Sequence, residues 1–427
     1  MPTISGLYRV CFKNQRDFAH MKNLIVGLKL LSFMIMLTLT SNLFAIVGTE
    51  FGMSDSGVSY PQTAWCPRYN PAGIALVGNR WDVELMSSIN RGRASLKGSS
   101  IPLFNTSSST TAQDWQPYAI AGICGYVTPN ICLGLSLDAT RSFIHKTTKN
   151  WPIFGLGKQK AEAEIPIVVP TIAWKINDCH QIGLSIPVFF ARTSFSGLQN
   201  LEQVSETPSA VTNRGHDYAY GVSVRAGWLW QINPCLTFGV MYAPRLLAAS
   251  HFHKYRGEIP LKGKLEVPNN LYTGLTYQWG NWTFTTQYDY TWYRQERTLS
   301  NSPTSPHLFG SRKGPALGWH NVSILHFAAE YRFSECFLLQ GGYAVQIPPL
   351  VNKSNANANG VLYTYFLPTQ TIDVAATWDV CGYDLTLRYI RFLSRTVSGP
   401  AQDSLFGGHI KSRFYLNGFS VRLGTCF

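Results

Sequence analysis

The chain has 427 residues, of which 45% are apolar and 14% are charged, against roughly 25% charged residues in typical soluble domains. This composition excludes intrinsic disorder, which requires low hydrophobicity and high charge density. The net charge of +13 would suit nucleic acid or anionic lipid as a partner, but the basic residues are scattered along the sequence. Only one long apolar run occurs, which argues against a helical membrane protein, and the 57 aromatic residues favour an all-β fold.

The first 45 residues have the features of a signal peptide. A mostly apolar stretch at 30–39 follows basic residues, and the segment ends on the small residue Ala45. That stretch is shorter than the ~20 residues of a membrane-spanning helix, so we expect cleavage after Ala45. Residues 1–20 are polar and precede Met21, which is an alternative start of the protein. The exported part keeps a net charge of +9, because residues 1–45 hold five basic residues and one acidic residue. Export argues against nucleic acid as a partner.

Residues 46–80 show neither an amphipathic period nor the alternation of a strand. Glycine, serine and proline are frequent, and the sequence Asn-Pro-Ala-Gly occupies 70–73. This composition predicts an irregular segment in front of the first strand.

From residue 81 onward, strand-like runs alternate with connections of two different lengths. Six connections are very short turns, at 128–130, 177–178, 233–234, 280–281, 334–335 and 380–382. Seven are long polar segments, at 91–114, 144–162, 194–216, 250–268, 294–318, 348–369 and 394–412. Thirteen connections join fourteen strands, and the split between short turns and long loops is the layout of an outer-membrane β-barrel. An even number of strands places both ends on the short-turn, periplasmic side.

Apolar and polar residues alternate along the runs, as expected for strands with one face toward lipid. In the last run, Phe419, Val421 and Leu423 share one face, and Ser420 and Arg422 share the other. The aromatic residues expected at the membrane interfaces are Trp228, Trp230, Tyr288, Tyr290, Tyr331 and Phe333. The terminal phenylalanine resembles the signal by which the barrel assembly machinery of Gram-negative bacteria recognises its substrates. The alternative fold, a secreted β-sandwich, does not explain connections that divide so cleanly by length.

The irregular segment and several strands together resemble a known family. Asn70, Pro71, Ala72 and Gly73 are similar to the hatch motif of the FadL family, the outer-membrane transporters of long-chain fatty acids and, in some members, aromatic hydrocarbons. Other similar segments are 233–242, 267–277, 288–293, 327–333 and 339–344. The resemblance covers the whole exported chain. It implies an all-β protein, a 14-stranded antiparallel transmembrane barrel at 81–427 plugged by an N-terminal hatch at 46–80, with the motif residues acting in gating.

The resemblance also implies passive import of a hydrophobic ligand across the outer membrane. A fatty acid crosses a leaflet of lipopolysaccharide poorly, whereas apolar pockets stabilise it by ~0.8 kcal/mol per buried methylene. The first expected ligand is a long-chain fatty acid, and the alternatives are aromatic hydrocarbons or other lipids. In the family, an inward kink of the third strand opens the barrel wall sideways. Here that strand is expected at 131–143, where Gly134 is the only strand-breaking residue.

A fatty acid carboxylate is best bound by arginine, whose planar fork donates two hydrogen bonds. Strand parity directs three arginines into the lumen, namely Arg225, Arg388 and Arg422. The alternative for each is a lining role, paired with Asp384, Glu330 or the hatch. A neutral hydrophobic ligand would need none of them.

Cysteine placement departs from the family, whose members usually lack such a set. The candidates for disulfides are Cys66, Cys132, Cys179, Cys235, Cys336, Cys381 and Cys426. Cys66 precedes the hatch motif, and the others lie at or near short turns. An oxidising compartment permits disulfides, which would join the hatch to the wall or the barrel to other envelope proteins. The alternatives are free thiols, and a structural envelope protein cross-linked through these cysteines.

Signals for enzyme chemistry are weak. No Cys-x-x-Cys pair occurs, and no spacing suggests a Ser/His/Asp triad. His251 and His253 alone are too few for a metal site. The glycines at 155 and 157 lie in a long loop without the strand-to-helix context of a phosphate-binding loop. We therefore expect no enzyme activity, cofactor or metal.

Overall fold

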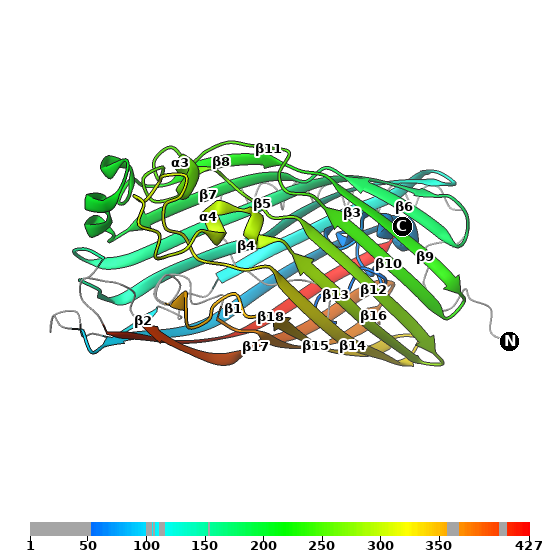
Figure 1. Ribbon diagram of the computed structural model, residues 1–427. Coiled ribbons are helices and arrows are strands. Elements are labelled where there is room, and N and C mark those ends of the chain that lie inside the picture. Colours follow the sequence, from blue (N-terminus) through cyan, green and yellow to red (C-terminus); the bar gives the residue numbers. More distant parts are fainter. Residues whose placement is uncertain are drawn as a thin grey trace.

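The computed structural model describes residues 53–99, 105, 107–110, 116–152, 154–356, 367–400 and 408–427. The expected signal peptide at 1–45 lies outside these residues. The described strands form one antiparallel sheet that closes into a barrel, with the long-loop end at the left of Figure 1 and the C-terminus at the other end.

The strands are β1 (Arg80–Lys97), β2 (Ser107–Thr110), β3 (Gln116–Thr128), β4 (Ile131–Asn150), β5 (Lys158–Lys175), β6 (His180–Ser185), β7 (Val188–Ser196), β8 (Asp217–Val222), β9 (Arg225–Asn233), β10 (Leu236–Ala243), β11 (Ala248–Ala249), β12 (Asn270–Trp279), β13 (Trp282–Thr291), β14 (Val322–Ser334), β15 (Phe337–Ile347), β16 (Gln370–Val380), β17 (Tyr383–Pro400) and β18 (His409–Cys426). The short helices are η2 (Cys66–Arg68), η3 (Pro71–Gly73), α2 (Ile74–Val77), η5 (Gln199–Val204), η6 (Pro208–Ala210), α3 (Pro260–Gly263), η7 (Tyr293–Gln295) and α4 (Arg297–Ser300).

These strands form fourteen staves of the barrel, because four staves are interrupted. The interrupted staves are β2 with β3, β6 with β7, β8 with β9, and β10 with β11. For example, β6 and β7 both pair with β5 on one side. Closure comes from β1 and β18, which pair in register from Arg80↔Cys426 to Lys97↔His409. The predicted fold, a closed 14-stranded antiparallel barrel, is confirmed.

All six short turns lie where the sequence predicts them, but several strands extend into the predicted loops. The strand β1 continues to Lys97, β4 to Asn150 and β17 to Pro400. The segments predicted as loops at 91–114, 144–162 and 394–412 are therefore shorter. The physical reason is that the ends of β1 and β17 lie beyond the outer apolar band, where the outward residues are polar. The hydrogen-bond ladder continues there, and the inward residues Ala94, Leu96 and Val397 stay buried.

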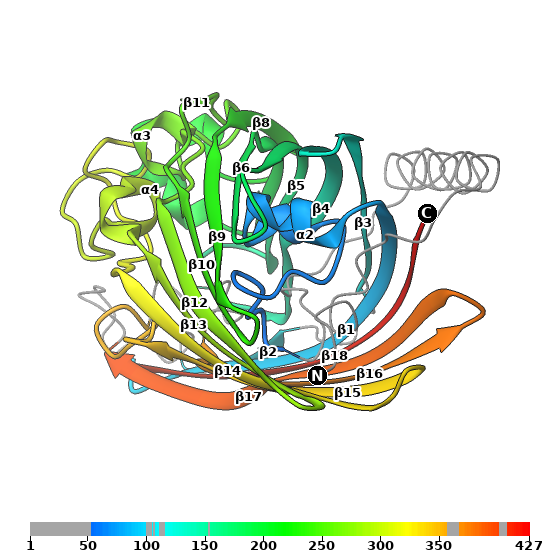
Figure 2. The same ribbon diagram turned by 90° about the vertical axis from the view of Figure 1, so that its right-hand side faces the viewer.

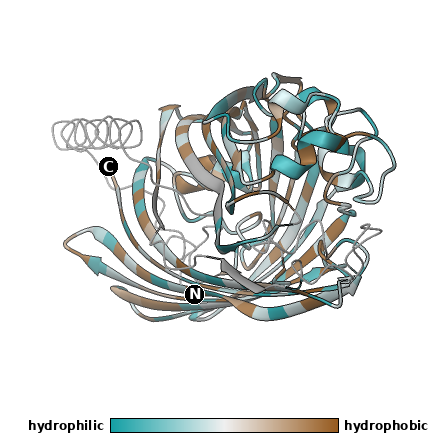
Figure 3. Ribbon diagram, turned by 90° about the vertical axis from the view of Figure 1, so that its left-hand side faces the viewer, coloured by the Kyte–Doolittle hydropathy of each residue, from teal (hydrophilic) through white to brown (hydrophobic). Residues whose placement is uncertain are grey.

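The outer surface carries the expected apolar side chains. The side chains of Phe419 and Val421 are 55% and 46% exposed. Arg422, the residue after Val421, is only 4% exposed and faces the lumen. Trp228 and Trp230 stack with ring centroids 5.9 Å apart. The alternation of polar and apolar residues is visible along the strands in Figure 3. Among the described residues, no helix is long and apolar enough to cross a membrane.

Residues 53–79, called the hatch below, lie inside the ring of strands (Figure 2). The short helix α2 packs its Ile74 and Val77 side chains with cysteines and alanines of the hatch and of β3, β4 and β5. Trp65 packs in a second cluster with Met86 of β1 and Ile120 of β3. A four-residue helix is too short to be stable alone, so the hatch depends on the wall for its conformation.

Candidate functional site

The motif predicted for gating forms the turn where the hatch meets the wall. Asn70 caps η3, because its Oδ1 accepts a hydrogen bond from Ala72 N at 3.1 Å. Its Nδ2 donates to Val58 O of the hatch at 2.8 Å and to Trp228 O of β9 at 3.1 Å. One fully buried side chain therefore joins two hatch segments to the barrel wall.

Two wall glycines allow the hatch turn to approach this closely. A Cβ at Gly227 would lie 2.0 Å from Asn70 Oδ1, and a Cβ at Gly183 would lie 2.3 Å from Ala72 N. Both distances are impossible for real atoms, so any side chain there would displace the motif. Glycine inside a strand is the sequence signal for such an approach.

Lumen-facing carboxylates hold the hatch backbone. Asp82 of β1 accepts a hydrogen bond from Ala64 N at 2.8 Å, and Asp373 of β16 accepts one from Ser54 N at 3.2 Å. His326 of β14 contacts Ser54 O through Nδ1 and Asp289 through Nε2, the latter at 3.0 Å. These wall residues were not identified from the sequence, because residues scattered over the chain meet only in the folded barrel.

Two of the predicted ligand arginines bind these same carboxylates. Arg388 forms a bidentate pair with Asp373, with Nε–Oδ1 2.8 Å and Nη2–Oδ2 2.5 Å. Arg422 lies 3.2 Å from Asp82 Oδ1 and also donates to Thr386 Oγ1. Both arginines therefore line the lumen in ion pairs, as the alternative from the sequence has it. Arg388 also lies 3.9 Å from Asp55 of the hatch, whereas Asp373 and Asp82 were not among the partners named in advance. A role of Arg388 and Arg422 in ligand binding stays a prediction.

The third arginine lies in a different environment. Arg225 Nη1 donates to Pro67 O of the hatch at 3.3 Å, and its side chain lines a cavity between the hatch and the wall. A second cation, Arg68, lines the same cavity together with apolar groups of Phe189, Met241 and Val267. The cavity of about 40 Å³ has room for a few water molecules or a compact head group.

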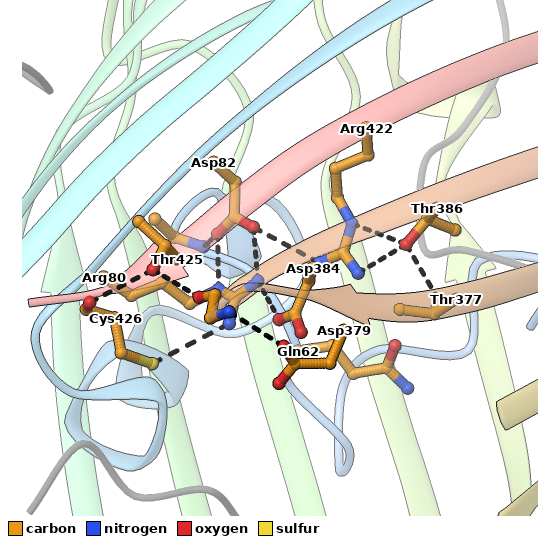
Figure 4. Close-up of polar contacts among 12 residues, drawn as sticks. Gln62, Arg80, Asp82, Thr377, Asp379, Asp384, Thr386, Arg422, Thr425 and Cys426 are labelled. Carbon is orange, nitrogen blue, oxygen red and sulfur yellow. Dashed lines mark hydrogen bonds and ion pairs between the residues drawn. The ribbon is translucent and has the colours of Figure 1, made fainter. Parts of the chain in front are cut away.

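A larger cavity of about 140 Å³ lies at the periplasmic end, between the hatch and β14 to β17, and charged groups line much of it. Arg80 bridges Asp82 at 2.7 Å and Asp384 at 2.8 Å, and Arg422 lies beside them (Figure 4). The apolar tail of a ligand in this cavity would displace water from the charged side chains and offer them no hydrogen bonds in return. The periplasmic cavity is therefore unfavourable for a hydrophobic molecule.

The seam between β3 and β4 is paired over only part of its length. Ala121 to Thr128 of β3 pair with β4 from Leu137 back to Ile131, whereas 116–120 pair only with β1 among the described residues. On its other side, β4 has a register shift against β5 between Asp138 and Arg141. The third stave, longer than the predicted 131–143, is therefore irregular at mid-height.

Cysteines occupy two sites. Cys66, Cys124 and Cys132 are buried around α2. Cys124 Sγ lies 3.1 Å from Gly78 O and Cys132 Sγ lies 3.4 Å from Ile74 O. Both thiols donate to backbone carbonyls at the C-terminal side of the motif.

Four other cysteines are exposed free thiols at the short-turn end, one in each of four turns, namely Cys179, Cys235, Cys336 and Cys381. Cys426 Sγ lies 3.9 Å from Arg80 Nη1. The predicted disulfides to the wall or to other proteins stay predictions. In the described part of the chain, no group of three or more His, Cys, Asp or Glu side chains is placed to hold a metal ion.

Comparison with solved structures finds the same architecture in hydrophobic-compound channels. A FadL homologue of Pseudomonas aeruginosa aligns with a TM-score of 0.63 at 12% identity, over 90% of this chain and 99% of that one. The toluene transporter TodX of P. putida aligns with a TM-score of 0.65 at 10% identity, over 88% and 97%. The toluene transporter TbuX of Ralstonia pickettii aligns with a TM-score of 0.62 at 14% identity, over 90% and 99%. No protein-family model and no curated protein matches the chain in sequence.

These similarities confirm the FadL fold and an outer-membrane β-barrel. The solved structures are transport proteins rather than enzymes. At identities of 10–14% the likeness concerns the fold, and the ligand has to be inferred from the interior of this chain.

Proposed function

We propose that this protein is a passive outer-membrane channel for hydrophobic small molecules, and that its ligands carry an anionic head group, as long-chain fatty acids do. The observation that carries the proposal is the cavity beside the hatch, which places Arg225 and Arg68 next to apolar side chains. Guanidinium groups bind carboxylates by charge-assisted hydrogen bonds. An alkane would gain nothing from these two cations, and an aromatic hydrocarbon would gain only a cation–π contact.

The route that we propose leaves the barrel sideways. The cavity at the periplasmic end is lined by ion pairs, whereas the β3–β4 seam lacks described pairing at 116–120 and faces the bilayer. A ligand that leaves through this seam never loses its apolar surroundings. Movement of the motif at 70–73 would couple binding to release, because a ligand shifts a gate only by differential affinity for its two states.

The test is equilibrium binding of radiolabelled oleate and of methyl oleate to the purified, detergent-solubilised barrel. We expect saturable oleate binding that weakens roughly 10- to 100-fold in R225Q, the range for one charge-assisted hydrogen bond, and unchanged methyl oleate binding. The matched control is R332Q, which removes one cation from the other cavity. Equal binding of both compounds to wild type and R225Q would instead favour aromatic hydrocarbons or other neutral lipids as ligands.

A second candidate function is a structural envelope protein cross-linked through its cysteines. The observation in its favour is the set of four exposed thiols at the short-turn end. Non-reducing electrophoresis of whole envelopes would show reductant-sensitive high-mass species, and these would disappear when Cys179, Cys235, Cys336 and Cys381 are all changed to serine. Saturable oleate binding by that serine variant would leave transport as the function.

A further inference from the structure

The basic residues that look scattered in the sequence are gathered by the barrel on one part of its outer wall. β17, β18 and β1 are adjacent strands, paired over most of their length. Near the long-loop ends of β1 and β18, and midway along β17, side chains that point outward are basic. The set, called the outer basic patch below, comprises Arg91, Arg93, Lys97, Arg391, Lys411 and Arg413, and all six are exposed.

The outer basic patch begins where the apolar band ends. On β1 the outward residues Leu85 and Ile89 are 59% and 44% exposed, and the next outward residue is Arg91. On β18 the apolar Phe419 is followed on the same face, toward the loops, by Asn417 and Tyr415 and then by Arg413 and Lys411. The patch therefore lies at the level of the outer leaflet's head groups, above the acyl chains that the apolar residues contact.

The register places like charges directly against each other. Arg93 pairs with Arg413, and Lys411 on the same face of β18 is the next outward residue. Like charges directly opposite on neighbouring strands are destabilising. Such a pair is stable when an anion lies between the two guanidinium groups.

Among the described residues, no carboxylate supplies that anion. Residues 85–97, 385–400 and 409–426 contain no aspartate or glutamate, and none of the six side chains forms an ion pair within the described chain. On β5 and β7, by contrast, Lys160 pairs with Glu162 and Arg192 with Glu164. Arg413 Nε donates to Ser394 Oγ at 2.7 Å, which orients the guanidinium and uses only one of its five N–H donors.

We propose that the outer basic patch binds the phosphate groups of a phosphorylated glycolipid of the outer leaflet, the lipid A part of lipopolysaccharide. Phosphate offers the geometry that paired guanidinium forks bind. The acyl chains of the same molecule lie against Leu85, Ile89 and Phe419, so one ligand satisfies both the charge and the apolar surface. This site is on the outside of the barrel and does not depend on which compound the lumen carries.

The experiment measures binding of diphosphoryl lipid A to the purified full-length barrel in detergent, by native mass spectrometry and by thermophoresis. The double variant R93Q/R413Q should bind lipid A at least about 10-fold more weakly than wild type, and binding to wild type should weaken as salt rises. The control R312Q/K313Q removes two exposed loop cations and should bind within about twofold of wild type. Dephosphorylated lipid A should bind wild type as weakly as diphosphoryl lipid A binds R93Q/R413Q.

Three results would overturn the proposal. These are unchanged lipid A binding by R93Q/R413Q, equally tight binding of the dephosphorylated lipid, and displacement of lipid A by inorganic phosphate at matching concentration. Folding is checked by the mobility difference between boiled and unboiled samples on gels. If R93Q/R413Q does not fold, K97Q/K411Q removes two other cations of the patch and must show the same weakening.

Discussion

At Gly227 the barrel wall has no side chain, because Asn70 of the hatch occupies the space that a Cβ would need. The same asparagine donates to carbonyl groups of the hatch and of the wall. Position 227 therefore controls how firmly the motif is held, although it lies 154 residues from the motif's last residue, Gly73.

We expect the substitution Gly227→Ala to loosen the hatch. The new methyl group would push Asn70 away and leave its buried partners without hydrogen bonds, at a cost of roughly 1–3 kcal/mol. Single-channel recording in planar bilayers should show ion conductance that wild type lacks or shows more rarely. The control is Gly341→Ala in β15, where a Cβ meets nothing within 4 Å. Equal conductance in G227A and G341A would contradict this role for position 227.

A second residue-scale prediction concerns Glu258, in the loop between β11 and β12. Burial raises the pKa of its carboxyl to about 8, and Oε2 has no hydrogen-bond partner among the described residues. An unfolded loop would titrate near pH 4.3, so the folded loop binds more protons between these values and loses stability as pH rises from about 4.5 to 8.

The substitution Glu258→Gln should remove that dependence. Limited proteolysis within 250–268 should be at least about threefold faster at pH 8.5 than at pH 5 in wild type, after correction for the protease's own pH profile. In E258Q the two rates should agree. A wild-type loop that is cut equally fast at both pH values would show that this carboxyl does not control the loop.

At the scale of elements, the hatch and the β3–β4 seam have opposite properties. The hatch is bound to several strands by buried side chains at about 1 kcal/mol net per hydrogen bond, so its complete expulsion would be costly. The seam, by contrast, lacks described pairing between 116–120 of β3 and the facing part of β4. We therefore expect release through the seam, with a small shift of the hatch, to cost less free energy than release past an expelled hatch.

A covalent bond across the seam should block transport. If the register of Ala121↔Leu137 continued, residue 120 would face residue 138, so we choose I120C/D138C in a background with Cys124 and Cys132 changed to alanine. Oxidation should lower oleate uptake by cells at least about fivefold, and reductant should restore it, because the disulfide fixes the two strands together. The control pair is T285C/A328C, opposite residues of β13 and β14. Full uptake by the oxidised seam variant would exclude this route.

At the scale of the whole molecule, the barrel separates three environments. Its outer band is apolar, its lumen is lined by paired charges and filled by the hatch, and its loop-side rim carries the outer basic patch. The fourteen staves close on themselves through β1 and β18, and the ladder of this closure involves no hatch residue. At the short-turn end, Asn79 of the hatch accepts hydrogen bonds from Tyr126 N and Phe427 N.

Deletion of 53–79 should therefore leave a folded barrel with an open, water-filled lumen. The charged lining would then conduct ions, as in porins, and planar bilayers should show a steady open channel in place of rare openings. Saturable oleate binding should disappear, because Arg68 and the hatch side of its cavity are removed. A closed or unfolded product would mean that the hatch is part of the wall's stability.

The sequence by itself determined the class of fold. Alternation of apolar and polar residues and the division of connections into short and long predict fourteen staves, because these properties are local to each strand and turn. The Asn-Pro-Ala-Gly motif also identified the turn by which the hatch meets the wall. Inward-facing arginines were recognisable, because a period of two fixes the face of every residue in a strand.

Only the tertiary structure decided what those residues meet. It paired Arg388 with Asp373 and Arg422 with Asp82, placed Arg225 beside Arg68, and brought basic residues from three distant segments onto one outer surface. It also showed strands longer than the apolar pattern, because the ladder continues beyond the membrane. The physical reason is common to all: register and closure join residues far apart in the chain, and no local pattern contains that information.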